Sequence, residues 1–167
     1  MFARLIVGAF AFQLASAGDF FAQLEPDRTL HRVGNWQISS ARFGIGCVAQ
    51  VEYSPNHHLS LSGENSRALS LLITVDQRLF NTKVDGSQEG ELDDIEIALK
   101  DRRWGGVEGY GYRGTPGVVL KLKPDFLRSF ANSKAMKVTE RGAEKLRIDL
   151  ARPRDVVSSL TASFQRE

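Results

Sequence analysis

Residues 94–122 constrain the fold more than any other stretch, because both of its ends alternate apolar with polar residues. The alternating apolar positions are Ile95, Ile97 and Leu99 at one end, and Val118, Leu120 and Leu122 at the other. A period of two places such residues on one face of a strand. The aromatic, glycine-rich residues 104–114 between them predict a third strand. We therefore predict an antiparallel meander at the centre of a half-exposed sheet.

The remaining chain shows the same alternation over shorter lengths. It predicts strands at 35–39, 45–53, 59–61, 69–75, 136–138 and 146–150. Leu72 points away from the apolar face of its strand, so we expect that second face to be partly covered as well. Pro124 and Pro153 each mark the first turn of a helix. The helical apolar positions are Phe126, Leu127 and Phe130, then Val157, Leu160 and Phe164.

These elements define the fold class as β-rich α+β. We expect an antiparallel sheet, or a small sandwich or barrel, of about seven to nine strands with two short helices in the C-terminal half. The 167 residues fit one domain with a sizeable core. We place that domain at 35–164, after a flexible leader at 18–34.

Residues 1–17 have the features of an export signal. Arg4 gives a positive start, residues 5–14 form an apolar run too short to span a bilayer, and residues 15–17 read Ala-Ser-Ala. Cleavage there leaves Gly18 at the mature N-terminus, with a buried N-terminal strand or helix as the alternative. No later run approaches the roughly 20 apolar residues of a membrane span. The sequence predicts a periplasmic or secreted protein.

The net charge excludes one class of partner, and the single cysteine limits the possible disulfides. Removal of Arg4 lowers the formal net charge from +2 to +1, which gives no electrostatic footprint for nucleic acid. Cys47 is the only cysteine and cannot form an internal disulfide. On a strand it shares a face with Ala49 and Val51, so we expect a buried, inert thiol. An intermolecular disulfide and a nucleophile are the alternatives.

The order of several landmarks carries a resemblance. They are the export signal, Trp36-Gln37-Ile38, Gly46-Cys47-Val48-Ala49, Trp104-Gly105, Phe126-Leu127, Met136-Lys137-Val138 and residues 146–150. Together the chain resembles the small exported β-rich proteins of Gram-negative bacteria that include the invasion-associated locus B family. The resemblance implies a periplasmic or secreted accessory protein without established catalytic residues. Its members tend to carry a late second cysteine, where this chain offers Ser158, Ser159 and Ser163.

The acidic stretch 85–96 is the strongest motif match. A twelve-residue calcium loop needs oxygen ligands at positions 1, 3, 5, 7, 9 and 12 and a glycine at position 6, here Gly90. The corresponding residues are Asp85, Ser87, Glu89, Glu91, Asp93 and Glu96. The flanks favour strands, whereas that motif needs helices. The alternative is a solvated acidic loop whose charges protect a sheet edge.

No catalytic constellation emerges. His57 and His58 follow Pro55-Asn56 in a predicted turn, close to Glu52. Zinc would need further ligands, and only His31 and Cys47 are available, so we expect exposed loop histidines. No serine lies in a nucleophile elbow and no phosphate-binding glycine motif occurs. We predict a non-enzymatic protein without a cofactor.

The aromatic set Trp104, Tyr110 and Tyr112 beside Arg113 is the best candidate for binding. Tyrosine, tryptophan and arginine are the residues that binding hot spots favour. The alternative is structural packing over the open face of the sheet. We expect an exported accessory protein that binds a protein or an envelope component. A calcium-stabilised domain and an inhibitor of an exported hydrolase are the other hypotheses.

Overall fold

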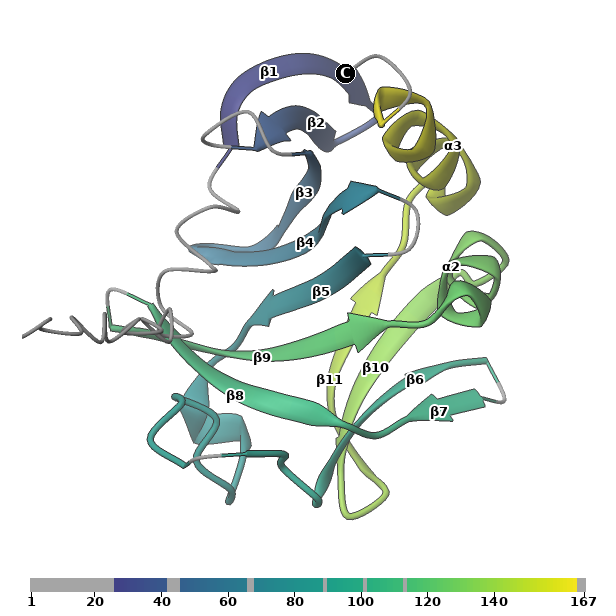
Figure 1. Ribbon diagram of the computed structural model, residues 1–167. Coiled ribbons are helices and arrows are strands. Elements are labelled where there is room, and N and C mark those ends of the chain that lie inside the picture. Colours follow the sequence, from purple (N-terminus) through teal and green to yellow (C-terminus); the bar gives the residue numbers. More distant parts are fainter. Residues whose placement is uncertain are drawn as a thin grey trace, which may run out of the picture.

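The computed structural model describes residues 26–164 except 42–45, 66–67, 89, 101 and 113. Within these residues the chain forms eleven strands in two antiparallel sheets, with two α-helices late in the chain (Figure 1). The predicted β-rich α+β class is confirmed, and neither sheet closes into a barrel within the described residues. The strands exceed the seven to nine expected, because β1 is added to the larger sheet and the three-residue β7 to the smaller one.

The larger sheet has seven strands. In spatial order they are β1 (Pro26–Val33), β2 (Trp36–Ala41), β3 (Cys47–Ser54), β4 (His57–Asn65), β5 (Ala68–Thr74), β9 (Thr115–Leu122) and β8 (Val107–Tyr112). The smaller sheet has the order β11 (Ala143–Asp149), β10 (Ala135–Glu140), β6 (Ile95–Leu99) and β7 (Arg102–Trp104). The helices α2 (Pro124–Ala131) and α3 (Pro153–Ser163) lie side by side (Figure 1).

One apolar core joins both sheets and both helices. Leu71 and Ile97, from the two sheets, and Phe130 of α2 are each at most 1% exposed and belong to this core. The period-two faces predicted from the sequence point into it. Cys47 lies there fully buried beside Ala49, as expected for a small inward side chain. Leu72 packs on the opposite face against Tyr110 and Val119, which confirms that the second face is partly covered.

The meander prediction for 94–122 is wrong. The strands β6 and β7 pair in the smaller sheet, whereas β8 and β9 pair in the larger one. The predicted third strand is interrupted at Gly105-Gly106, where the chain passes from one sheet to the other. Gly106 has φ +76°, a conformation that glycine adopts without the penalty a side chain incurs. The stretch therefore joins the two sheets instead of forming the centre of one.

The boundary of the predicted leader is also wrong in part. Residues 26–33 form β1, which pairs with β2. The register shifts between Pro26 and Arg28 and again between Thr29 and His31, so the alternation expected of a strand is lost. Residues 18–25 of the predicted leader and the predicted export signal at 1–17 lie outside the described residues.

Both predicted helices are present, each with proline in its first turn. In α2, Phe126 and Phe130 are fully buried, as the spacing predicts. In α3 the buried positions are Val156, Leu160 and Ser163, one residue before two of the expected positions. Val157 and Phe164 are only partly buried, because the helix turns its other edge toward the core.

Candidate functional site

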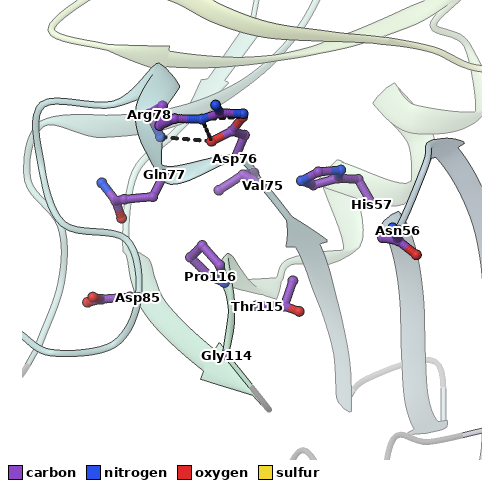
Figure 2. Close-up of a pocket in the computed structure, with 10 residues that line it drawn as sticks. All are labelled: Asn56, His57, Val75, Asp76, Gln77, Arg78, Asp85, Gly114, Thr115 and Pro116. Atoms are coloured by element: carbon purple, nitrogen blue, oxygen red, sulfur yellow. Dashed lines mark hydrogen bonds and ion pairs between the residues drawn. The ribbon is translucent and has the colours of Figure 1, made fainter.

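A pocket lined by polar and charged side chains lies at one end of the larger sheet. It has a volume of about 540 Å³, within the range of small-ligand sites. Three separate segments line it: the β3–β4 turn with Asn56 and His57, residues 75–78 together with Asp85, and the β8–β9 turn at 114–116 (Figure 2). We call this site the turn pocket.

Backbone hydrogen bonds hold these segments together. The amide of Val75 donates to the carbonyl of Pro116 over 2.9 Å, and the amide of Gly117 donates to Val84 over 3.2 Å. Asn56 adopts φ +62° in its turn, and its amide donates to the carboxylate of Glu52. Turns fixed in this way by a sheet can present side chains in a constant arrangement.

The charged groups of the turn pocket are two carboxylates and one guanidinium. Arg78 binds Asp76 through two nitrogens, with the closest contact at 2.6 Å, and holds the pKa of Asp76 at about 2 (Figure 2). Hydrogen bonds from Ser87 lower the pKa of Asp85. Both carboxylates are therefore ionised at neutral pH. The pocket offers polar and charged groups beside the apolar side chains of Val75 and Pro116.

A buried carboxylate holds the residues that follow the 75–78 wall of the turn pocket. Glu140, at the end of β10, is 2% exposed and accepts the amide of Thr82 over 2.7 Å and the amide of Asn81 over 3.0 Å. Lys145 completes this arrangement with an ion pair of 3.0 Å. Burial raises the pKa of Glu140, but the hydrogen bonds and the ammonium outweigh burial and lower it to about 2.

The side chain of Gln77 connects Thr82, which the Glu140 carboxylate holds, and Val84 to the pocket. Its amide group donates to the carbonyl of Thr82 and accepts the amide of Val84, at 3.0 and 2.9 Å. Glu140 thus holds residues 81–82, and Gln77 holds the pocket wall to them. The sequence analysis did not identify Glu140 as a functional residue. It lies two residues after Val138 and four after Met136, both fully buried, and this alternation was the signal that it faces inward.

The acidic loop runs along the exposed edge of β8. The amide of Leu92 donates to the carbonyl of Val107, and the amide of Tyr110 donates to the carbonyl of Val84. The backbones of Glu91 and Glu108 also pair in an isolated antiparallel β-bridge. A Cβ on Gly111 would lie 2.2 Å from the carbonyl oxygen of Asp85, so only glycine there permits this approach. The loop covers the edge of the larger sheet, which agrees with the alternative that it protects a sheet edge.

The candidate calcium ligands do not converge. Asp85 accepts the amide of Ser87, and Glu96 lies in β6, where it pairs with Arg103 over 3.2 Å. Glu89 lies outside the described residues. In the part of the chain that the structure describes, no three His, Cys, Asp or Glu side chains are grouped to hold a metal ion, Glu91 and Asp93 included. The arrangement gives a calcium site no support.

The predicted aromatic set is also not brought together. Trp104 lies in β7 of the smaller sheet, 9% exposed, with its ring edge-on to Phe126 at 5.0 Å. Tyr110 lies in β8, 6% exposed, on the outer face of the larger sheet. The side chain of Tyr112 and residue Arg113 are outside the described parts. The burial of Trp104 and Tyr110 favours structural packing over a shared binding patch.

His57 and His58 are half-buried at the start of β4, not exposed in a loop as predicted. The His57 ring nitrogen Nδ1 lies 2.9 Å from the carbonyl oxygen of Pro55, which fixes the ring at the pocket. Among the described residues, no serine, threonine or cysteine side chain hydrogen-bonds to this ring. The turn pocket therefore presents no nucleophile paired with a base.

Comparisons with known proteins return no relative. No protein-family model matches the chain, and neither does any curated protein or solved structure. Nothing in them points to catalysis. Neither described helix has the length and apolar character needed to cross a membrane.

Proposed function

We propose that the chain is an exported, non-enzymatic accessory protein that binds a protein or envelope component through the turn pocket. The observation that carries this proposal is the meeting of three segments, separated in the sequence, around charged and polar side chains at one end of the larger sheet. Loops fixed by a scaffold are where binding residues concentrate. A periplasmic or secreted location follows from the export signal at 1–17.

The electrostatics of the turn pocket favour a polar partner. Arg78 is 89% exposed yet fixed by Asp76, so its remaining N–H groups are directed outward. Asp85 and the ring of His57 add an acceptor and a titratable group on the opposite walls. A partner surface that carries both acidic and basic groups would complement this arrangement.

Export is tested by expressing the full chain in a Gram-negative host and measuring the mass of the product in the periplasm and medium. We expect a mature chain that begins at Gly18. Retention of the full chain in the cytoplasm would contradict the proposed location.

Binding is tested by affinity capture from envelope extract with the mature chain, 18–167. The pocket variant is H57A/R78A, and the matched control is H31A/R147A, which removes the same residue types at exposed positions outside the pocket. We expect the wild type and the control to recover the same component, and the pocket variant to lose it. Equal recovery by all three would exclude the turn pocket as the binding site.

A further inference from the structure

A second pocket lies between the end of α2, the residues before β10 and the start of α3. It has a volume of about 360 Å³. The polar residues that line it are Asn132, Ser133, Lys134, Arg152, Arg154 and Asp155. We call it the basic pocket, because three cationic side chains face one carboxylate. It is separate from the turn pocket and shares no lining residue with it.

The walls of the basic pocket are fixed by hydrogen bonds to backbone carbonyls. The amide of Leu150 donates to the carbonyl of Lys134 over 2.8 Å, and the indole N–H of Trp36 donates to Ala151 over 3.0 Å. Ser133 is 2% exposed, and its hydroxyl donates to the carbonyl of Ser129. The backbone on both sides of the pocket is therefore held in place without a ligand.

Both guanidinium groups are held by neighbours that leave most of their donors unused. Arg154 donates from Nη2 to the side-chain oxygen of Asn132, and Arg152 donates from Nε to Asp155, each over 2.7 Å. An arginine has five N–H donors, so several remain on each group. Planar guanidinium groups suit the paired oxygens of phosphate and related anions.

The positive charge of this pocket is only partly balanced. Asp155 pairs with Arg152, but within the described residues neither Lys134 nor Arg154 forms an ion pair with a carboxylate. Such an excess raises the local concentration of anions.

We propose that the basic pocket binds a phosphate group, with Arg152, Arg154 and Lys134 as its ligands. The phosphate belongs either to a small soluble anion or to a lipid headgroup, because the recognition chemistry is the same for both. This site goes beyond the proposed partner-binding function and does not depend on it.

The experiment titrates the mature chain with inorganic phosphate by calorimetry at low salt, and with phosphatidylcholine vesicles with and without phosphatidic acid. The pocket variant is R152Q/R154Q, and the control is R103Q/R147Q, which removes two arginines from the smaller sheet. We expect the pocket variant to bind at least about tenfold more weakly than wild type, because two charge-assisted contacts are lost. We expect the control to match wild type.

Phosphate binding that the pocket variant loses assigns the site to a soluble anion. Binding confined to vesicles with phosphatidic acid, and lost in the same variant, assigns it to a headgroup. If neither probe binds wild type, or the variants bind equally, the proposal is overturned. K134Q, at an exposed position, replaces the double variant if circular dichroism shows that R152Q/R154Q does not fold.

Discussion

The turn pocket and the basic pocket differ in charge and in what supports them. The turn pocket has two carboxylates and one guanidinium, whereas the basic pocket has three cations and one carboxylate. The turn pocket is held by backbone hydrogen bonds and by the side chains of Glu140 and Gln77. The basic pocket is held by the indole N–H of Trp36 and the backbone bond from Leu150 to Lys134. A chain with a net charge of only +2 thus presents two chemically distinct surfaces.

The charge difference follows the order of the sequence. Residues 76–108 contain nine acidic and five basic residues, while residues 121–155 contain five acidic and ten basic ones. Residues 76–78 and 85 of the first segment line the turn pocket, and residues 132–134 and 152–155 of the second line the basic pocket. The strands β6 and β7 of the first segment and β10 and β11 of the second pair in the smaller sheet (Figure 1). The net charge alone therefore says little about the partners of this protein. The predictions below separate the two pockets.

The largest effect is expected from Glu140→Gln. The substitution removes the charge that binds two amides and Lys145 in a buried position. We expect the free energy of unfolding to fall by about 2–4 kcal/mol, because buried donors lose a charged acceptor. Urea unfolding measures the loss. Hydrogen exchange should rise at residues 76–85 and stay unchanged around the basic pocket. A uniform rise would contradict the proposed role of Glu140 in holding residues 81–82.

Gly111→Ala should displace the acidic loop from β8. The new Cβ would meet the carbonyl oxygen of Asp85 at 2.2 Å, so the backbone has to shift. We expect a cost of about 1–3 kcal/mol, typical of overpacking, with loss of protection at 84–92. Gly105→Ala is the control, since a Cβ there meets no atom within 4 Å. Equal unfolding midpoints for the two variants would disprove the close approach.

Trp36→Phe tests the support of the basic pocket alone. It removes the indole hydrogen bond to Ala151 while keeping an aromatic ring near Phe130. We expect a loss of about 1–2 kcal/mol, from the missing bond and a small cavity. Exchange should increase at the start of α3 and not at the turn pocket. The same increase at both sites would show that they are not independently supported.

The smallest expected effect is the contribution of Glu140 to the pH dependence of the free energy of unfolding in acid. Its pKa of about 2 in the folded chain lies below the ordinary glutamate value of 4.5. A depressed pKa stabilises the folded state above the unfolded value, and that contribution is lost as pH falls from about 4.5 to about 2. The stability difference between wild type and Glu140→Gln should therefore shrink over this range. A stability difference that stays constant over this range would contradict the lowered pKa of Glu140.

Period-two alternation predicts the interior of the sheets well. Ile95 and Val118 face the core as expected, because inward apolar positions dominate both strands. The strand β1 was missed because its two register shifts remove the alternation. The change of sheet at Gly106 was missed because a turn within one sheet and a crossing between sheets require the same local glycine conformation.

The candidate sites were harder to predict than the strands. The turn pocket depends on which turns meet, and that is set by strand order, which local patterns do not encode. The calcium spacing at 85–96 matched by position, yet Glu96 belongs to a strand and pairs with Arg103. Glu140 was missed because a glutamate beside Arg141-Gly142 has the composition of a solvated turn.

The most direct test of the central proposal is hydrogen exchange of the mature chain with its captured partner bound. We expect new protection at 56–57, 75–85 and 114–116, the three segments of the turn pocket. Protection confined to the basic pocket or to the outer faces of the sheets would contradict the proposed function.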